Sequence, residues 1–414
     1  MIDGIMTIDD LDFKGKTTFV RVDLNCPIDI ETDKFLDDRR IIKHAETLKE
    51  LSKKGAKVVV LAHQGRPGND YDFTSLKKHA ARLNELGLKV EHVPDIIGPT
   101  ACEKIKGMKD GEIILLENVR FLSEELLKRP PDVQSNSYFI RALAPLGDIF
   151  VSDAFAAAHR SQPSMVGFTE LLPSTAGRVM QNEFEMLTKV ITSKKKPSVF
   201  VVGGSKVKTS LKSVEQYLEK KIADKILTGG LVANIFLIAK GYEIRGLEYM
   251  EDYPKLVEQA KNLLNKYGTQ IEVPMDVAVD KHGQRLEVSL SELPLPYRIA
   301  DIGTGTIGRY KYILETAGTI VANGPMGIFE EKNFAKGTHE IVKAVAESKA
   351  FTVVGGGHIA TAVVHLGLED KITHISTGGG ACLSFLAGED LIAFQTLRNS
   401  AKKFKGGKNK PKED

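Results

Sequence analysis

Cysteine is scarce in this sequence, and the few cysteines form no pattern. Only three occur, Cys26, Cys102 and Cys382; their number is odd and no Cys-x-x-Cys pair exists. This spacing argues against a disulfide framework and against a zinc site built on paired cysteines. We therefore expect packed, reduced thiols and a cytoplasmic location.

Long apolar runs are also missing. A membrane-spanning helix needs about 20 consecutive apolar residues, whereas the run around Ile235–Ala239 is short and ends at Lys240. The first ten residues, MIDGIMTIDD, contain neither a basic region nor an apolar signal core. We expect no membrane association.

The net charge is close to balance. The 57 Lys and Arg residues against 54 Asp and Glu residues leave a charge of +3, which gives no sign of a nucleic-acid-binding protein. One basic run occurs, KKFKGGKNKPKED at 402–414, and it lacks apolar periodicity. We predict that residues 401–414 form a solvated, disordered tail; a binding role for this tail is the alternative.

What the sequence does contain is a repeated alternation of strand and helix. Apolar residues at helical spacing predict helices such as 38–55 and 74–87, which Gly55 and Gly87 end. Short β-branched apolar runs predict strands at 17–24, 57–62, 88–93, 112–117 and 148–154, then at 198–204, 225–230, 271–279, 298–303, 319–324, 351–357 and 373–380.

This alternation sets the expected fold. A length of 414 residues suits two or three domains. The stretch 176–196 reads as a helix with no strand before it in the usual rhythm, and therefore as a link between domains. We predict an α/β protein with two Rossmann-like, three-layer domains of mainly parallel sheet, residues 1–175 and 196–385, joined by an interdomain helix or hinge at 176–195.

The loops after the strands differ between the two halves. In the first half they carry Arg, His, Asp and Asn, whereas in the second they are glycine-rich. Ligands of open α/β sheets bind beyond the carboxyl ends of the strands. Side-chain cations suit a small anion, and backbone N–H groups at helix N-termini suit phosphates. The asymmetry predicts a phosphoryl acceptor on one half and a phosphoryl donor on the other.

In the first half, Arg21, Asp23 and Asn25 lie at alternate positions after a strand and hence on one face. Each Arg alone could be a surface ion-pair partner, each His could be structural, and Asp23 could simply pair with Arg21. A shared edge of the sheet favours a common anion site instead. The other candidates of this half are His63, Gly65, Arg66, Arg120, His159, Arg160 and, at the start of a helix, Arg40.

In the second half, GGGHIA at 355–360 lies between an expected strand and an expected helix, which is a phosphate-binding junction. GGSKV at 203–207 is similar and adds Lys206, which could reach a transferring phosphoryl group. Glu330 is a plausible acceptor for ribose hydroxyls. The alternative for any one glycine pair is a tight turn or close packing of helix and strand.

Two nucleotide motifs do not describe this chain. No GxxxxGK[ST] occurs, so it is not a P-loop enzyme. GTGTIG at 303–308 matches GxGxxG after an expected strand, but the dinucleotide fingerprint also needs an acidic residue at the end of the next strand. That strand ends at Asn323 with no Asp or Glu beside it, which argues against a dehydrogenase.

Eight segments occur in the order found in phosphoglycerate kinases, and the chain resembles that family over nearly its whole length, up to about residue 398. The segments are RVDLNCP, HQGRP, LLENVRF, DAFAAAHR, VVGGSKV, NGPMGIFE, GGGHIA and STGGGA. The resemblance implies an N-terminal domain for 3-phosphoglycerate or 1,3-bisphosphoglycerate and a C-terminal domain for Mg-ADP or Mg-ATP. It also implies that residues 386–400 pack back onto the N-terminal domain.

The resemblance carries roles to matching residues. Arg40 and Lys206 match the pair that flanks the transferring phosphoryl group. The positions matching the acid-substrate site are Asp23, Leu24, Asn25, Arg40, His63, Gln64, Gly65, Arg66, Arg120 and Arg160. Those matching the nucleotide site are Gly203, Gly204, Lys206, Gly229, Gly230, Asn323, Glu330, Gly355, Gly356, Gly357 and His358.

The expected chemistry needs no general base. The phosphoryl acceptor is a carboxylate, which is already ionised at pH 7, so positioning and cationic stabilisation suffice. Two half-sites on two domains must close over the substrates and exclude water. We expect the helix 177–193, which contains Glu183, to be part of the hinge.

The sequence departs from the family pattern at a few places. His358-Ile359 stand where many members have Asp-Thr, a form that resembles the archaeal branch and leaves Mg²⁺ to nucleotide oxygens and water, because imidazole is a poor magnesium ligand. Ser210 replaces a second lysine, for which Lys208 or Lys212 could substitute. Ala322 and Thr304 replace a Trp and a Pro.

The main hypothesis is therefore an active phosphoglycerate kinase of glycolysis or gluconeogenesis. The alternatives are a catalytically impaired homologue that binds nucleotide or a protein partner, and a kinase for another carboxylate. We expect a monomer, with a homodimer as the alternative, and small molecules rather than nucleic acid as partners.

Overall fold

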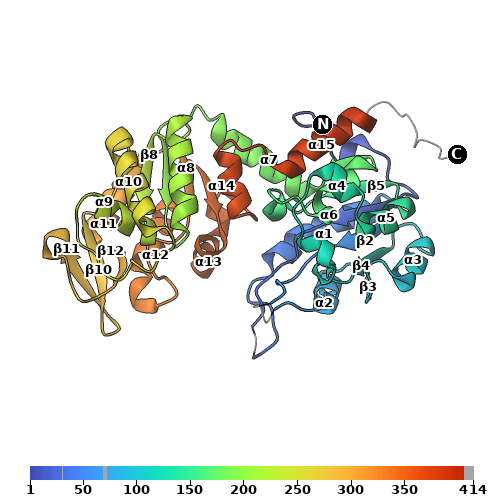
Figure 1. Cartoon of the computed structure of the whole chain (residues 1–414), viewed down its shortest axis with the longest axis horizontal. Coiled ribbons are helices and arrows are strands. Elements are labelled where there is room, and N and C mark those ends of the chain that lie inside the picture. The colour runs from blue at the N-terminus through green and yellow to red at the C-terminus, as the bar shows by residue number, and fades with distance from the viewer. Residues whose placement is uncertain (30, 69–71, 405–414) are drawn as a thin grey trace. The chain divides into compact units, whose positions relative to one another are not determined.

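The computed structural model describes residues 1–29, 31–68 and 72–404. The chain divides into two compact units. Unit 1 comprises Met1–Glu185 together with the segment from Asp390 onward, and unit 2 comprises Met186–Glu389. Each unit contains a six-stranded parallel sheet with helices packed around it (Figure 1). The helix α7 (Arg178–Ile191) contains the division between the units.

The sheet of unit 1 has the strand order β3-β4-β2-β1-β5-β6. β1 lies inside the sheet, since it pairs in parallel with both β2 and β5. The strands are β1 (Thr17–Arg21), β2 (Lys57–Leu61), β3 (Val90–Val93), β4 (Ile113–Leu116), β5 (Ile149–Ser152) and β6 (Ser174–Ala176). The α-helices are α1 (Arg39–Lys53), α2 (Lys77–Glu85), α3 (Pro99–Lys106), α4 (Pro131–Ser135), α5 (Tyr138–Leu143), α6 (Pro163–Val166) and α15 (Ile392–Phe404).

The sheet of unit 2 has the strand order β15-β14-β13-β7-β8-β9, again parallel throughout. The strands are β7 (Ser198–Val202), β8 (Lys225–Thr228), β9 (Ile271–Glu272), β13 (Thr319–Asn323), β14 (Phe351–Gly355) and β15 (His374–Ile375). The helices are α8 (Val207–Glu219), α9 (Gly230–Ala239), α10 (Tyr253–Tyr267), α11 (Thr304–Glu315), α12 (Lys336–Glu347), α13 (Gly357–His365) and α14 (Gly380–Leu386).

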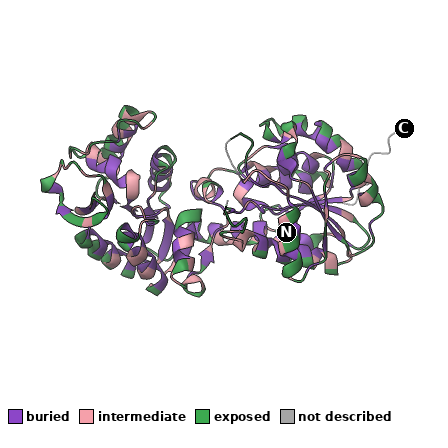
Figure 2. Ribbon diagram, turned by 90° about the horizontal axis from the view of Figure 1, so that it is seen from below, coloured by how far each residue is buried: buried purple, intermediate pink, exposed green. Residues whose placement is uncertain are grey.

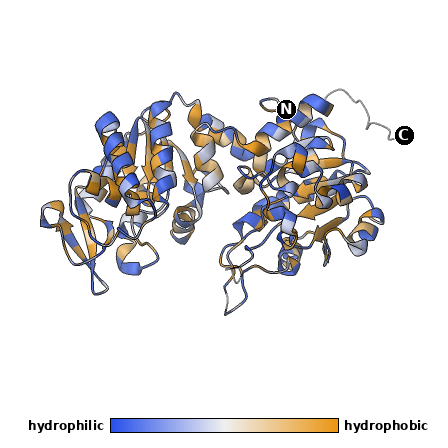
Figure 3. Cartoon of the chain, in the orientation of Figure 1, coloured by the Kyte–Doolittle hydropathy of each residue, from blue (hydrophilic) through white to orange (hydrophobic). Residues whose placement is uncertain are grey.

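Both faces of each large sheet are covered, which explains why inner strands such as β2 and β4 are apolar along most of their length. In unit 1, Val20 and Val58 belong to the core on one face, while their neighbours Phe19 and Val59 belong to the core on the other. Successive side chains of a strand point to opposite faces of the sheet, so neighbouring residues enter two different cores. Figure 2 shows the strands buried at the centre of each unit, and Figure 3 shows them as the apolar layer beneath helices with polar outer faces.

Unit 2 also contains a small antiparallel sheet that the sequence did not predict as such. The predicted strand 271–279 is wrong as one element, because β9 ends at Glu272 and β10 (Asp276–Lys281) starts a different sheet. The predicted strand 298–303 is β12 (Ile299–Ile302), which pairs antiparallel with β10 rather than joining the parallel sheet.

The third strand of this small sheet, β11 (Gln284–Ser289), was missed altogether. A two-residue turn joins β10 to β11, with positive φ at both His282 (+55°) and Gly283 (+81°). That geometry belongs to a type I′ hairpin, and the His-Gly pair was its signal. β11 is mostly exposed and polar, so it lacked the apolar run by which the other strands were predicted.

Two further expectations need correction. The predicted interdomain helix does follow a strand, the three-residue β6, which was too short to give a sequence pattern. The predicted disordered tail begins too early, because α15 continues to Phe404 and buries Ala401. The remaining part of that tail prediction, 405–414, lies outside the described residues.

Two other expectations concern the state of the cysteine thiols and the presence of membrane-spanning helices. Cys26 and Cys382 are buried, Cys102 is partly buried, and all three are free thiols. Across residues 1–29, 31–68 and 72–404, no helix has both the length and the apolar character needed to cross a membrane.

The GTGTIG segment is occupied by a carboxylate of the chain itself. Asp276 accepts hydrogen bonds from the backbone N–H groups of Gly305 (2.8 Å) and Thr306 (2.7 Å) at the start of α11. A Cβ on Gly303 would lie 2.2 Å from the Asp276 carboxyl carbon. The glycines therefore leave room for the Asp276 carboxylate, which caps the N-terminus of α11. In a nucleotide-binding helix, a phosphate would bind at this position.

We predict that Asp276→Asn lowers the stability of the protein by about 1–2 kcal/mol, because one amide oxygen cannot serve both N–H groups and the helix dipole loses its counter-charge. Urea denaturation followed by circular dichroism measures the change. Asp370→Asn is the control, since Asp370 is exposed and in the same unit. Equal midpoints for the Asp276→Asn variant and the wild type would contradict the prediction.

Candidate functional site

The carboxyl ends of the parallel strands in unit 1 bring polar side chains together at one edge of the sheet. The loop after β1 supplies Asp23 and Asn25, and the loop after β2 supplies His63, Gln64 and Gly65. The Gly65 N–H donates to Asn25 Oδ1 at 2.9 Å, so the two loops are in direct contact. The structure thus unites residues 40 positions apart, as the strand-end rule predicts.

Arg40, in the first turn of α1, reaches into this edge. Its Nη1 lies 3.1 Å from Asp23 Oδ2 and 2.9 Å from the Asn25 carbonyl oxygen. The Asp23 side chain is only 3% exposed and that of Arg40 is 31% exposed. Asp23 therefore forms its ion pair with Arg40, and not with Arg21 as the alternative interpretation of the sequence had it.

Gly65 is needed at its position by geometry. Its φ is +64°, and a Cβ there would lie 2.5 Å from the backbone of Phe73. Its carbonyl oxygen accepts a hydrogen bond from Arg120 Nη1. This close approach, anticipated from the HQGRP segment, fixes Arg120 against the loop after β2.

A buried chain of polar contacts behind the site was missed by sequence reasoning. Arg21 donates from Nε to Ser164 Oγ at 2.8 Å, and Ser164 Oγ donates to Glu125 at 2.5 Å. Arg21 Nη2 lies 2.9 Å from His63 Nδ1. Since a guanidinium only donates, Nδ1 accepts and the His63 proton sits on Nε2. Glu125 and Ser164 gave no signal, because each is an isolated polar residue in a loop or short helix.

The electrostatics of this edge are those of an anion site. Burial lowers the pKa of Arg120 to about 10, and the neighbouring guanidinium groups of Arg160, Arg21 and Arg66 contribute in the same direction. Burial, followed by Arg21, also lowers the pKa of His63 well below its usual value. Like charges held this close favour a bound anion that neutralises them.

Some predicted acid-substrate residues have side chains committed elsewhere. Leu24 is fully buried in the apolar core. Gln64 exchanges two hydrogen bonds with the backbone of Cys26 and also contacts Asp72 and His79. Both residues support the loops rather than offering a free side chain. Arg66, in contrast, is exposed.

Unit 2 contains a cavity of about 760 Å³. Gly204, Gly230, Glu330 and His358 of the predicted nucleotide residues line it. The remaining wall comes from the segments around Tyr249 and 295–302 and from the small antiparallel sheet. It was not predicted, because the sequence did not indicate this small sheet. Other lining residues are Asn234, Ile244, Val277, Tyr297, Ile299 and Met326. The volume and the largely apolar lining suit a nucleotide base and ribose.

Four predicted phosphate-binding glycines donate their N–H groups internally. Gly203 donates to Asn323 O (2.9 Å), Gly204 to Pro325 O (2.9 Å), Gly229 to Val202 O (3.1 Å) and Gly230 to Met326 O (2.8 Å). A Cβ at Gly203 would lie 2.1 Å from Pro325 O, and one at Gly230 would lie 2.8 Å from Gly204 N. These contacts are those of close packing of the chain, the alternative interpretation for a glycine pair, although Gly204 and Gly230 also line the cavity.

The start of α13 does offer free donors. Gly356 has a φ of +94° and precedes the helix, whose first N–H groups have no acceptor within the helix. Gly357 and His358 are exposed there. Asn323 Oδ1 would lie 3.0 Å from a Cβ at Gly356, and Asn323 Nδ2 is buried with no hydrogen-bond partner among the described residues. Backbone capture of phosphate is therefore best supported at Gly355–His358.

Lys206 is the exposed residue immediately before α8, and within the described part of the chain its ammonium has no hydrogen-bond or ion-pair partner. Lys208 and Lys212, considered as substitutes for a second lysine, are instead ion-paired with Asp252 (2.7 Å) and Glu389 (2.8 Å). Ser210 is buried. Lys206 is thus the available cation of this segment.

No resident metal site is visible in the part of the chain that the structure describes, where no group of three or more His, Cys, Asp or Glu side chains gathers.

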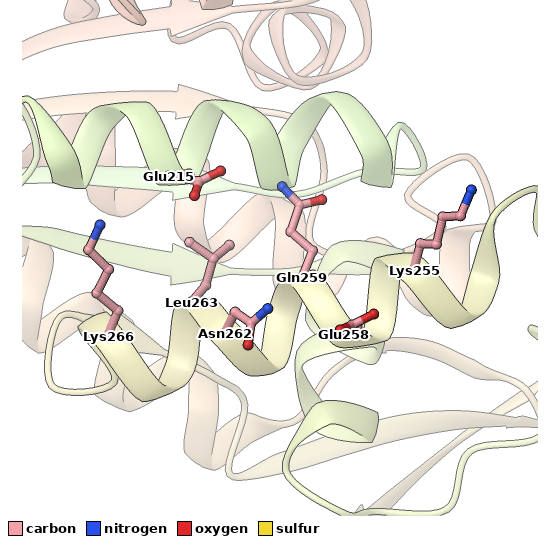
Figure 4. A pocket seen from close by; sticks show the side chains of 7 residues that line it. All are labelled: Glu215, Lys255, Glu258, Gln259, Asn262, Leu263 and Lys266. Atoms are coloured by element: carbon pink, nitrogen blue, oxygen red, sulfur yellow. The ribbon is translucent and has the colours of Figure 1, made fainter.

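A second hollow, of about 270 Å³, lies between α8 and α10 (Figure 4). Its carboxylates Glu215 and Glu258 are offset by Lys255 and Lys266, and none of the predicted site residues lines it.

We predict that Asp23→Asn destabilises the protein by about 2 kcal/mol at pH 7, because it breaks a buried ion pair. Although burial opposes it, the charges of Arg40 and Arg21 and the hydrogen bond from the Asn25 N–H lower the pKa of Asp23 below its usual value. A lowered pKa in the folded state stabilises above the unfolded value of about 3.9. The difference in the free energy of unfolding between wild type and variant should therefore shrink as the pH falls below about 4. Urea midpoints at pH 7 and pH 3.5 test this, with the exposed Asp110→Asn as control; a constant difference would contradict it.

Comparisons with known proteins agree with this geometry. The sequence profile of the family described as phosphoglycerate kinase matches residues 8–389. The phosphoglycerate kinase of Methanothermus fervidus is 48% identical over 402 residues, covering 96% of this chain and 98% of that protein. That of Methanococcus maripaludis is 48% identical over 412 residues, covering 97% and 99%. The crystal structure of phosphoglycerate kinase from Pyrococcus horikoshii OT3 has a TM-score of 0.91 at 44% identity, covering 97% of this chain and 100% of that one. The chain therefore belongs to the phosphoglycerate kinase family, as the order of its motifs predicted.

Proposed function

We propose that this chain catalyses reversible phosphoryl transfer between 1,3-bisphosphoglycerate with ADP and 3-phosphoglycerate with ATP, using the residues assigned below. The family supports the reaction, and the archaeal relatives match nearly the whole chain. The observation on which the residue assignment rests is the cluster of guanidinium groups at the strand ends of unit 1, where burial and mutual repulsion lower the pKa of Arg120.

Unit 1 supplies the acid-substrate site in this proposal. Arg21, Arg66, Arg120 and Arg160 neutralise the phosphate and carboxylate of 3-phosphoglycerate, and His63 donates a hydrogen bond from Nε2. Arg21 was a candidate from its position after the strand, although the family resemblance did not assign it a role, and its hydrogen bond to His63 Nδ1 places it beside this site. Arg40, held by Asp23, stabilises the transferring phosphoryl group.

Unit 2 supplies the nucleotide site. The base and ribose occupy the cavity, Glu330 accepts from ribose hydroxyls, and the α13 N-terminus at Gly355–His358 binds phosphate. Magnesium enters as part of Mg-ADP or Mg-ATP, held by nucleotide oxygens and water. Lys206 neutralises charge on the transferring group.

The chemistry follows from these charges. The carboxylate of 3-phosphoglycerate attacks without prior deprotonation, since it is already ionised at pH 7. Catalysis then consists of aligning acceptor and donor and of stabilising the charge on the transferring phosphoryl oxygens. The acyl phosphate product is hydrolysed by water, so the proposal includes exclusion of water from the site. The proposal also includes a cytoplasmic location.

We expect ATP-dependent formation of 1,3-bisphosphoglycerate, measured by coupling to its reduction with NADH. Arg40→Ala and Lys206→Ala should each lower kcat by at least about 100-fold, because each removes a cation from the transition state. Lys208→Ala and Lys212→Ala, in the helix that follows Lys206, are matched controls and should lower kcat by less than about threefold. A wild-type protein that folds but does not turn over would reject the function, and full activity of Lys206→Ala would reject its assignment.

We also expect small-angle scattering to show a smaller radius of gyration with 3-phosphoglycerate and Mg-ADP together than with either alone. Two half-sites on separate units must come together around the reacting atoms. An unchanged radius at saturating ligand would contradict closure, and titration calorimetry in the same buffer serves as the check that both ligands are bound.

A further inference from the structure

His44 is a fully buried side chain of α1 that the proposed reaction does not use. It follows Arg40 by one helical turn, so both residues lie on the same side of α1. Nothing in its sequence context singles it out, because it occupies an ordinary inward position of an amphipathic helix. Its two ring nitrogens, however, both have polar partners.

These partners hold the imidazole in one tautomer. The backbone N–H of Asp23 lies 3.2 Å from His44 Nε2, and His44 Nδ1 lies 3.0 Å from Asp153 Oδ2. A backbone amide only donates, so Nε2 accepts. The proton then sits on Nδ1 and is donated to the Asp153 carboxylate.

The chain of hydrogen bonds continues at both ends. On one side, Asp23 Oδ2 receives Arg40 Nη1 at 3.1 Å. On the other, Asp153 Oδ1 accepts the backbone N–H of Met180, in the first turn of α7, at 3.1 Å. A Cβ on Gly177 would lie 2.3 Å from Asp153 Oδ1, so the carboxylate packs directly against the start of α7.

We propose that His44 is a positioning residue for phosphoryl transfer, which ties the backbone at Asp23, and through it the Arg40 guanidinium, to the first turn of α7. This inference rests on the proposed role of Arg40. Without the imidazole, the loop after β1 loses its anchor, and a guanidinium displaced by a fraction of an ångström stabilises the transition state less well. The other cations still bind 3-phosphoglycerate, so the loss falls on kcat and not on KM.

A double-mutant cycle tests this link. We expect His44→Leu to lower kcat about tenfold when Arg40 is present, and by less than about twofold in an Arg40→Ala background, because the effect passes through Arg40. KM for 3-phosphoglycerate should change by less than about twofold. His44→Gln, whose amide can both accept and donate, should recover more than half of the lost activity.

Thr47→Val is the matched control. Thr47 lies near His44 in the next turn of α1, is fully buried, and has a hydroxyl without a hydrogen-bond partner among the described residues. It should leave kcat within about twofold of the wild type. Should His44→Leu fail to fold, Asp153→Asn takes its place in the cycle, since an amide cannot accept from both His44 and Met180.

The outcomes separate this inference from the proposed function. Equal losses with and without Arg40 would show a general structural effect and overturn the inference, as would unchanged kcat in folded His44→Leu. If Arg40→Ala itself retained full activity, the proposed role of Arg40 would fail instead, whatever His44 does.

Discussion

The buried ion pair between Asp23 and Arg40 is the interaction on which the proposed acid-substrate site depends. A carboxylate that is 3% exposed is stable as an anion only when cations and N–H donors surround it. Arg40 provides the closest charge, and the N–H of Asn25 donates to the same carboxylate at 3.0 Å. The pair in turn sets where Arg40 lies, because a guanidinium held at two oxygen atoms has little rotational freedom.

The two units solve the problem of holding phosphate differently. In the proposed site of unit 1, burial and neighbouring guanidinium groups lower the pKa of Arg120, so a bound anion would relieve an electrostatic cost. Unit 2 offers an exposed lysine, the N-terminus of α13 and a cavity with apolar walls. Under the proposed function, the charged half would select for a small, highly charged ligand, and the apolar half for a ligand with a flat base.

Much of this arrangement could be predicted from the sequence, because parallel strands give a strong local signal and a fixed rule for where ligands bind. The runs before Asp23, His63, Asn323 and Gly355 all proved to be strands of the large sheets. The small sheet was not predicted, since β11 is exposed and polar and β10 follows β9 after only three residues. The hydrogen-bond partners of buried polar groups could not be predicted either, because Glu125 and His44 bond to residues distant in the chain.

The internal hydrogen bonds of Gly203, Gly204, Gly229 and Gly230 have a consequence for how nucleotide binds. Loops whose N–H groups are already satisfied by carbonyl oxygens are ordered before the ligand arrives. Association then does not have to fix their backbone dihedrals, which would otherwise cost about 1–2 kcal/mol for each residue. In the proposed nucleotide site, these glycines would form a rigid surface for the ligand, and little binding free energy would be spent on ordering the chain.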